Sequence, residues 1–412
     1  MERILIKDLS GNIGGEVLIK GWVDIRRDHG KLIFMDIRDV SGKVQAVALP
    51  NHTEAHTIAN TVRPEWVLEM HGKVNARPEK MIKKDEQNGV IEIEILNIVV
   101  LNKATTPVFD VGTDGRDINE ETRLKYRYLD LRRPRMQANI HNRHKAIQFV
   151  REFYTRHNFT EIETPYLTKS TPEGSRDYIV PSRLDQGKFY ALPQSPQQYK
   201  QLLMSAGFER YFQIARCFRD EDTRGDRQPE FTQIDIEMSF VVQEDVMVMN
   251  EKMITELVAT LYPEKQITQI PFPRFSYKEV MEKYGSEKPD LRKNKNNLNE
   301  LAFCWVVDFP FFEKTEEGGW TFTHNPFSAP KPEFVADLLA EKNIGDIVAA
   351  QYDMVLNGFE IGGGGIRNHT PAMLRAVFEI MGYESEKIEK NFGHMLEAVS
   401  YTHLTLPTNR EV

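Results

Sequence analysis

The first hundred residues constrain the fold most, because their apolar residues come in short runs separated by turns. The clearest runs cover residues 17–23, 32–37 and 44–49, and two more cover residues 66–70 and 91–101. Runs of this length, closed by Gly, Asp and Asn, are typical of β-strands in a small barrel or sandwich. The pattern predicts a five-stranded β-barrel over residues 1–103, for which the oligonucleotide-binding (OB) fold is a candidate. A small β-sandwich is the alternative.

The net charge argues against bulk binding of nucleic acid by the whole chain. The 412 residues include 53 Lys and Arg against 61 Asp and Glu, which leaves a net charge of −8. An acidic chain can hold a polyanion only through a local cluster of basic residues. One such cluster, with tyrosines between its Arg and Lys residues, runs from Arg123 to Arg135. We therefore expect a basic hinge over residues 104–135.

Cysteines and apolar segments predict the compartment. The two cysteines, Cys217 and Cys304, are too few for a disulfide framework and are not spaced as zinc ligands. Residues 1–8 carry charges where a signal peptide needs an apolar stretch, and no apolar run approaches the length of a membrane span. We expect a cytoplasmic protein with no membrane partner.

Beyond the hinge, helical and strand patterns are mixed, which predicts an α+β domain over residues 136–401. Apolar residues at helical spacing predict a helix from Ile140 to Tyr154 that ends near Asn158. A strand is expected over residues 160–165, followed by a helix with Ser195 as its N-cap that stops at Gly207. Because strands and helices do not alternate one for one, an antiparallel sheet flanked by helices is favoured over a doubly wound parallel sheet.

A strand, a charged loop and a return strand form the sharpest candidate site. Within residues 233–238, alternation places the apolar side chains on one face and the Gln, Asp and Glu side chains on the other. The incoming strand ends at Arg219 and the loop carries Arg224, Asp226 and Arg227, so Arg219 and Arg227 are placed to bind a phosphate in bidentate fashion. A solvated edge hairpin is the alternative, but the clean segregation of the two faces favours a lined pocket.

A second candidate site follows from the dipeptide Asn357-Gly358, a strong signal for a two-residue hairpin. Centring the hairpin there pairs Val355 with Glu360 and places Asp353 opposite Gly362, on the same face as Glu360. Two carboxylates at this spacing can share Mg²⁺.

The glycine run that follows, residues 362–365, would let a ligand approach the backbone closely. Regular alternation turns Arg367 to the opposite face from Glu360, so Arg367 reaches the same ligand only if the run contains a bulge. The run is not a P-loop, because it lacks the Gly-Lys-Ser/Thr ending and the following helix. A flexible glycine turn between strands is the alternative.

Three further signals are weak by themselves. Residues 171–177 form a polar turn, and residues 194–200 begin a capped helix in which Lys200 is by default a surface lysine. His324 is by default a loop or core histidine.

Taken together, these segments resemble the class II aminoacyl-tRNA synthetases, most closely the bacterial aspartyl-tRNA synthetases, from about residue 16 to residue 401. Residues 159–165 are similar to motif 1 of that family, whose proline belongs to a dimer interface, and residues 218–237 are similar to motif 2. The resemblance implies an anticodon-binding barrel, a class II catalytic domain, a homodimer and a basic hinge near the tRNA backbone.

The resemblance also implies roles for individual residues. Those that contact the anticodon, by the stacking and edge hydrogen bonds that single-stranded RNA allows, would be Arg27, Phe34 and Gln45. The aspartate pocket would consist of Glu173, Gln197, Lys200, Arg219, Gln233, Asp235, His324 and Arg367. ATP would be bound by Arg219, Glu221, Arg227, Gln228 and Glu360, with Arg219 and Glu221 as the catalytic residues. Mg²⁺ would be held by Asp353 and Glu360.

The implied reaction joins L-aspartate to tRNA(Asp) in two steps, with ATP as a substrate. Attack of the aspartate carboxylate on the α-phosphate releases pyrophosphate, and the aspartyl group then passes to the terminal ribose of the tRNA. Neither step needs a protein nucleophile, so positioning and stabilisation of phosphate charge carry the catalysis. Buried positive charge at Lys200 and Arg367 would select aspartate over asparagine. His29 is the first residue to test for charging of tRNA(Asn) as well.

Two departures from the family pattern are expected to matter. Only residues 293–299 lie where bacterial relatives carry an insertion domain, so we expect that domain to be absent and the adenylation site to be intact. After residues 392–398 the family continues into motif 3, a Gly-rich strand and helix whose arginine clamps ATP, and this chain shows no such motif. We expect residues 402–412 to be an aberrant tail on a truncated catalytic domain, and this polypeptide to activate aspartate poorly.

Two other functions stay open on the sequence alone. An asparaginyl or lysyl relative is the nearest rival, and residues 194–200 together with Arg367 argue against it. An RNA-binding protein without catalysis, made of the barrel and a decayed synthetase body, is favoured by the missing motif 3.

Overall fold

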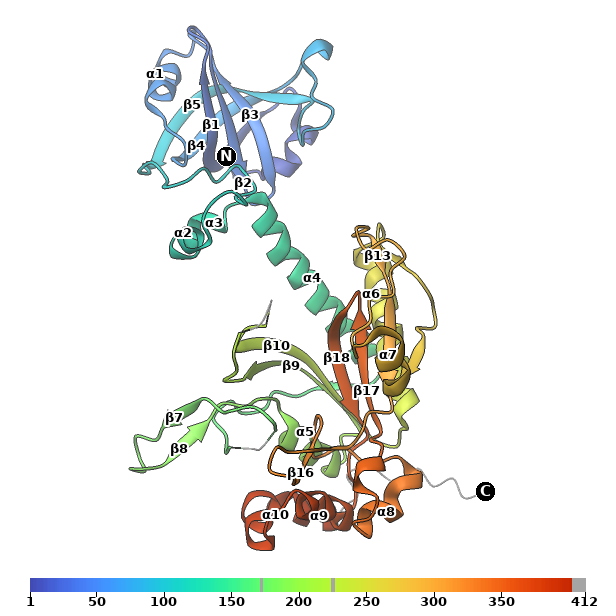
Figure 1. Cartoon of the computed structure of the whole chain (residues 1–412). Helices are drawn as coiled ribbons and strands as arrows, with labels where there is room; N and C mark the ends of the chain where they lie inside the picture. The colour runs from blue at the N-terminus through green and yellow to red at the C-terminus, as the bar shows by residue number, and fades with distance from the viewer. Residues whose placement is uncertain (171–172, 224–226, 402–412) are drawn as a thin grey trace. The chain divides into compact units, whose positions relative to one another are not determined.

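The computed structural model describes the chain except for residues 171–172, 224–226 and 402–412, and it forms two compact units, Met1–Asn142 and Arg143–Val412. The unit boundary falls inside helix α4 (Pro134–Arg156), which covers the helix predicted from Ile140 to Tyr154 (Figure 1). The expected aberrant tail, the loop residues Arg224 and Asp226, and the start of the polar turn at 171–172 all lie outside the described residues. The domain boundaries at residues 103 and 135 stay predictions.

The first unit is built on a closed five-stranded barrel with the strand order β1-β2-β3-β5-β4, which confirms the predicted OB-type architecture. Neighbouring strands are antiparallel except for the parallel pair β3 and β5. Alternate residues of each strand point inward, so the barrel core is almost wholly aliphatic. The strands are β1 (Glu16–Asp28), β2 (Ile33–Asp39), β3 (Gly42–Ala48), β4 (Val67–Ala76) and β5 (Ile91–Asn102), accompanied by η1 (Ile6–Asn12), α1 (Thr53–Thr61) and η2 (Glu79–Met81).

The basic segment after the barrel folds into the short helices α2 (Glu120–Lys125) and α3 (Arg127–Asp130) and the start of α4. Its arginines gather around one fully buried acid, Asp130, which accepts hydrogen bonds from Arg127 and Arg133 at 2.8 Å each. Arg132 forms an ion pair with Glu65 of the barrel unit. Several of the basic side chains are therefore already paired with acids within their own unit.

The second unit is α+β, with largely antiparallel sheets flanked by helices, as predicted. A three-stranded sheet has the order β10-β9-β6 and a four-stranded sheet has the order β12-β14-β17-β18. Their strands are β6 (Thr160–Glu161), β9 (Arg210–Phe218), β10 (Glu230–Met238), β12 (Arg274–Ser276), β14 (Phe303–Val307), β17 (Gln351–Leu356) and β18 (Phe359–Gly365). The helices are α5 (Gln197–Ser205), α6 (Gln243–Leu261), α7 (Tyr277–Tyr284), α8 (Val335–Leu339), α9 (Pro371–Ile380) and α10 (Ser385–Tyr401).

Smaller elements complete this unit. They are the paired strands β7 (Ile179–Pro181) and β8 (Phe189–Ala191), β11 (Gln266–Ile267) and β13 (Glu300–Leu301), β15 (Phe312–Lys314) and β16 (Trp320–Phe322), and the turns η3 (Pro332–Phe334) and η4 (Ile344–Asp346).

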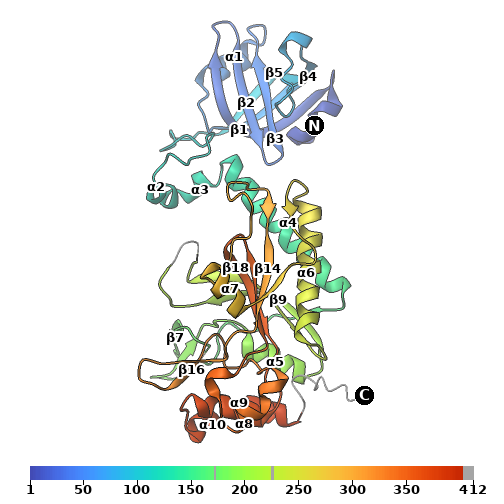
Figure 2. The same ribbon diagram turned by 45° about the vertical axis from the view of Figure 1, so that its right-hand side comes forward.

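The two sheets are held by a core in which α6 packs against β14, through residues such as Met253, Phe303 and Trp305. Helices α8, α9 and α10 lie together (Figure 2), and α9 and α10 share an aromatic cluster of Phe378 and Phe392, whose rings stack at 4.2 Å. Among the helices of the described residues, none has the length and apolar content that a bilayer crossing needs.

Two local predictions are wrong. The strand expected over residues 160–165 is only Thr160–Glu161, because the chain then leaves β9 and Pro165 has no N–H for a further ladder bond. Helix α5 has Pro196, not Ser195, at its N-cap, because the Ser195 hydroxyl donates instead to Glu173 Oε2 at 2.6 Å. The helix ends two residues before Gly207, which takes the left-handed φ of 87° that suits a glycine after a helix.

Candidate active site

A polar cleft of about 1060 Å³ lies between β10 and β18, the edge strands of the two sheets. Residues of both strands line it, together with the loop between β9 and β10. Every residue predicted for aspartate, ATP or metal lines this cleft except Glu173. The twelve that do are Gln197, Lys200, Arg219, Glu221, Arg227, Gln228, Gln233, Asp235, His324, Asp353, Glu360 and Arg367.

Two residues of the acidic face predicted for residues 233–238, Gln233 and Asp235, line this cleft. Strand β10 pairs with β9 without a register shift, so alternation holds along its whole length. Asp235 and Glu237 are 7% and 8% exposed, although both are carboxylates. Gln233 accepts a hydrogen bond from the thiol of Cys217 on β9 at 3.2 Å. Buried carboxylates need partners of opposite charge.

Those partners are Lys200 from α5 and Arg367 from the segment after β18. Lys200 Nζ lies 2.6 Å from Asp235 Oδ1 and 3.5 Å from Glu237 Oε2, and Arg367 Nε lies 3.5 Å from Glu237 Oε1. Burial raises the pKa of Asp235, and the neighbouring Lys200 opposes that shift. We name Lys200, Asp235, Glu237 and Arg367 the charge quartet; its two cations balance its two anions.

Three buried polar atoms in and next to the quartet lack a hydrogen-bond partner in the described structure. They are Asp235 Oδ2, Arg367 Nε and Gln197 Nε2. Buried polar atoms in native proteins are nearly always satisfied, by protein, water or ligand. An acceptor beside two donors, all in one cleft, suits a ligand that carries both an ammonium and a carboxylate group.

The arginines of the β9–β10 loop lie further along the cleft. The Arg219 guanidinium stacks over the ring of Phe231 at 5.1 Å, which holds its planar fork in one orientation. Glu221 accepts a hydrogen bond from the Ser175 hydroxyl. Arg227 Nη2 lies 3.2 Å from Glu360 Oε2 on β18, so the loop reaches across to the second sheet.

The β17–β18 hairpin turns at Asn357-Gly358 and pairs Val355 with Glu360, as predicted. The next pair is Met354 with Gly362, so Ile361 is an extra, bulged residue. Asp353 therefore pairs with Gly363 and not with Gly362, and that part of the predicted register is wrong by one residue.

A bulge is present, as Arg367 required, but it is not inside the glycine run, where it was predicted. An extra residue in one strand reverses the faces of everything beyond it, so Arg367 lines the same cleft as Glu360. The bulge lies at Ile361, immediately before the glycine run.

The pair Asp353 and Glu360 suits a hard divalent cation. Burial, and after it the charge of Glu360, raises the pKa of the Asp353 carboxyl to about 8. A Cβ on Gly363 would lie 2.4 Å from Asp353 Oδ1, so only glycine leaves space at this oxygen. Among the described residues no group of three or more His, Cys, Asp or Glu forms a complete metal site. Mg²⁺ is usually coordinated by one or two protein carboxylates, and phosphates and water supply its other oxygen ligands.

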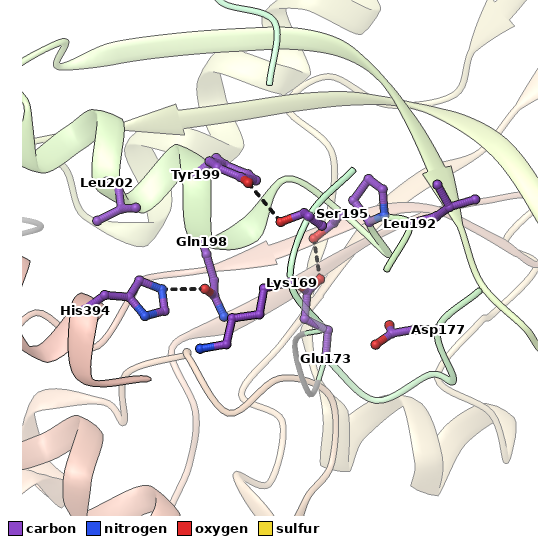
Figure 3. A pocket seen from close by; sticks show the side chains of 11 residues that line it. Lys169, Glu173, Asp177, Leu192, Ser195, Gln198, Tyr199, Leu202 and His394 are labelled. Atoms are coloured by element: carbon purple, nitrogen blue, oxygen red, sulfur yellow. Dashed lines mark hydrogen bonds between the residues drawn. The ribbon is translucent and has the colours of Figure 1, made fainter. Parts of the chain in front are cut away.

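Glu173 lies on the other side of the start of α5, in a second cavity of about 380 Å³ (Figure 3). Ser195 lines both cavities and donates to Glu173, so it connects this carboxylate to the cleft. In the same cavity the hydroxyl groups of Thr168 and Tyr199 form a hydrogen bond at 2.9 Å. His394 of α10 forms another through its Nε2, 2.7 Å from Gln198 Oε1. Helix α5 thus presents Gln197 and Lys200 to the cleft and Gln198 and Tyr199 to the second cavity.

His324 was expected either as a loop or core histidine or as a residue of the aspartate pocket, and its position has features of both. Its ring packs edge-on against Phe309 at 4.7 Å, as a core histidine would, and it also lines the cleft. Burial lowers the pKa of His324, which favours the neutral imidazole.

Some residues in the cleft or in contact with its residues have no role in the sequence-based prediction. Arg143 reaches it from α4, and Asn325 follows His324, but no local pattern marks either. Glu237 lies on the predicted acidic face, so alternation was its signal, although its ion pairs required the structure. Lys288 forms an ion pair with Glu360 from a loop far away in sequence.

The residues predicted for the anticodon gather on three neighbouring strands of the barrel. Arg27 on β1 faces Phe34 on β2 across the ladder, and its guanidinium lies 2.8 Å from Asp36. Gln45 on β3 is opposite Asp36 and donates to Glu92 at 3.5 Å. The ring of His29 meets Phe34 edge-on at 5.4 Å. The face thus combines an aromatic ring with paired donors and acceptors, as a single-stranded RNA site does.

Comparison with protein families gives two matches. Residues 119–407 match the family described as tRNA synthetases class II (D, K and N), and residues 17–101 match the OB-fold nucleic acid binding domain family, tRNA anti-codon type.

Curated relatives cover nearly the whole chain. The aspartate–tRNA ligase of Macrococcus caseolyticus is 38% identical over 94% of this chain and 86% of its own length, and the aspartate–tRNA(Asp/Asn) ligase of Dehalococcoides mccartyi is 38% identical over 95% and 87%. The first alignment spans 515 positions against the 412 residues of this chain, so the relative contains residues with no counterpart here. That is consistent with the expected absence of an insertion.

Solved structures share the fold at low sequence identity. The asparaginyl-tRNA synthetase of Pyrococcus horikoshii with asparaginyl-adenylate has a TM-score of 0.77 at 21% identity, covering 98% of this chain and 91% of that one. The aspartyl-tRNA synthetase of Entamoeba histolytica has a TM-score of 0.74 at 21% identity, covering 98% and 85%.

Proposed function

The chain belongs to the class II tRNA synthetases of the D, K and N group, its curated relatives are aspartate–tRNA ligases, and we propose that it activates L-aspartate with ATP and transfers it to tRNA. The observation that carries the choice of amino acid is the charge quartet, with its unsatisfied donors and acceptor in the cleft.

The quartet accounts for both ends of an amino acid. Asp235 Oδ2 is the acceptor for the α-ammonium group, supported by Gln233 and by Glu173 through Ser195. Lys200 and Arg367 carry the positive charge for the aspartate side chain, and Arg367 Nε, although it lies 3.5 Å from Glu237 Oε1, has no hydrogen-bond partner among the described residues. Asparagine offers an amide NH₂ where aspartate offers an acceptor oxygen, which would place N–H groups against N–H groups.

Arg219 binds the α-phosphate as the aspartate carboxylate attacks it, a role that its contact with the ring of Phe231 supports. Arg227 binds the departing pyrophosphate, and Glu221 and Gln228 bind the nucleotide; the position of all three in the cleft supports these roles. Asp353 and Glu360 would hold Mg²⁺, which when bound neutralises phosphate charge. The new P–O bond forms as the bond to pyrophosphate breaks, and a ribose hydroxyl of the tRNA then displaces AMP from the aspartyl carbonyl.

The remaining assignments rest on the sequence resemblance. We propose tRNA(Asp) as the RNA partner, with tRNA(Asn) as a second substrate for which His29 beside Phe34 is the residue to test. A homodimer is supported by the similarity of residues 159–165 to motif 1. A cytoplasmic location is supported by two buried cysteines that are both unpaired.

The proposed function is tested by ATP–pyrophosphate exchange with aspartate, asparagine and lysine in turn. Exchange that depends on aspartate alone is the expected result. Exchange with asparagine at an equal rate would overturn the assignment of the quartet, and exchange with none of the three would overturn activation by this chain.

A further inference from the structure

Glu360 is one of the two proposed Mg²⁺ ligands, and two basic side chains form ion pairs with the same oxygen of its carboxylate. Arg227 Nη2 and Lys288 Nζ each make their closest approach to Oε2, both at 3.2 Å. Arg227 lines the cleft and is available to phosphate, whereas Lys288 is not among the described residues that line it. Lys288 therefore approaches Glu360 from outside the cleft, where a bound nucleotide would not displace it.

The loop that carries Lys288 is well braced. It begins at Gly285, the left-handed residue that ends α7, and the Lys288 N–H donates to Ser286 Oγ at 3.1 Å. Two residues beyond Lys288, Asp290 accepts both the Nε and the Nη2 of Arg292, at 3.0 and 2.8 Å. Such a bidentate pair fixes the loop geometry strongly.

This loop also packs against the turn of the β17–β18 hairpin. A Cβ on Gly358 would lie 3.4 Å from Asp290 Cβ and 3.9 Å from the Lys288 carbonyl oxygen, which is ordinary contact distance. The loop and the hairpin that carries Glu360 are thus held together by backbone as well as by charge.

We propose that Lys288 is a positioning residue for the divalent cation, an inference that rests on the proposed function. By holding Oε2 of Glu360 from outside the cleft, it leaves Oε1 as the oxygen that turns to the metal beside Asp353. Partners that orient a metal-binding carboxylate typically affect metal affinity by about 10–100-fold when removed. Lys288 also lies 3.5 Å from Glu287 Oε1, but its contact with the cation site is through Glu360, whose oxygen it holds.

The test uses the full chain and Mn²⁺ as the probe, with free Mn²⁺ measured by electron paramagnetic resonance in the presence of a non-hydrolysable ATP analogue. Lys288→Met should weaken Mn²⁺ binding by about tenfold. Lys288→Arg should restore most of it, because a guanidinium can hold the same oxygen. Lys278→Met is the matched control, since Lys278 is on adjacent α7 with a side chain 85% exposed, and it should bind Mn²⁺ as the unaltered chain does.

Equal Mn²⁺ affinity in the Lys288→Met and unaltered chains would overturn the inference, as would an arginine variant as weak as the methionine variant. If the methionine variant fails to fold, the arginine variant decides, and a tenfold loss in that folded variant counts against the inference. If the unaltered chain binds the nucleotide analogue without Mn²⁺, the inference fails while the synthetase assignment stands. If it binds neither, the proposed function fails too.

Discussion

The barrel unit and the catalytic unit both bury charged side chains, but they differ in how deeply they bury the residues proposed to bind a substrate. In the barrel the core is aliphatic, and the residues proposed to contact RNA, Arg27, Phe34 and Gln45, are only partly buried. In the catalytic unit Lys200, Asp235, Glu237 and Arg367 are each at most 8% exposed and lie in the proposed amino-acid site itself. The proposed RNA-binding residues of the barrel are therefore additions to a finished fold, whereas the four residues of the quartet are part of the interior.

This difference has an energetic consequence. A large, flexible polyanion such as RNA can be bound on a surface, where ions stay hydrated and pairs are weak. A small zwitterion must be surrounded, so the groups that recognise it lose water and must balance one another's charge. Substitutions should thus affect binding alone in the barrel, and both binding and folding in the cleft.

The largest expected effect is that of Lys200→Met. It leaves Asp235 buried without its nearest cation and should lower the free energy of unfolding by about 3–5 kcal/mol. Lys278 is an exposed lysine of the same unit, and Lys278→Met should change the free energy of unfolding by less than about 1 kcal/mol. Urea denaturation of both variants measures the difference, and similar values would remove the contrast between the units.

A matched pair of glycines tests the carboxylate pair. Gly363→Ala places a methyl group 2.4 Å from Asp353 Oδ1 and should cost about 1–3 kcal/mol of stability, with weaker ATP binding in the presence of Mg²⁺. Gly362→Ala meets nothing within 4 Å and should be near neutral. Calorimetry and thermal unfolding check both variants, and equal behaviour would show that the space at Asp353 is not needed.

In the barrel, Phe34→Leu should weaken tRNA binding by about 1–3 kcal/mol, the usual loss of one stacked base, with little change in unfolding. Val99→Ala, a residue 44% exposed on β5, is the control and should leave tRNA binding unchanged. Filter binding at fixed salt measures both. A Phe34 variant that unfolds the chain would place this ring in the core and break the contrast.

The smallest effect is expected for the two cysteines, which should not react with an alkylating reagent in the native chain. Cys217 and Cys304 are both fully buried, and burial raises the pKa of each thiol to about 12, so the reactive thiolate is scarce at pH 8. Iodoacetamide should label neither thiol in the native chain and both in denaturant, as read by mass spectrometry. Rapid native labelling would mean that the catalytic unit opens more readily than its packing implies.

How far the sequence predicts this molecule depends on whether a feature is local. The barrel strands follow from alternation and turn residues, which act within a few positions. The acidic face of β10 follows from the same period of two. Gathering the site residues in one cleft required the family resemblance, since Gln197 on α5 and Arg367 after β18 are far apart in the chain.

What the sequence does not predict is decided by tertiary contacts. The bulge at Ile361 shifts the partner of Asp353 by one residue, and no residue type there signals it. Ser195 is a good N-cap by composition, but the carboxylate of Glu173 competes successfully for its hydroxyl. Arg143 and Lys288 reach the site from a helix and a loop with unrelated local patterns, so only the folded chain reveals them.

The buried charge quartet is proposed to recognise aspartate by the charge of its side chain. Titration calorimetry with two non-hydrolysable adenylate analogues, aspartyl and asparaginyl sulfamoyl-adenosine, measures this recognition independently of the catalytic rate. The aspartyl analogue should bind at least about a hundredfold more tightly, because the asparaginyl analogue lacks the second carboxylate oxygen that the quartet would pair with. Equal affinity for the two analogues, or tighter binding of the asparaginyl one, would contradict it.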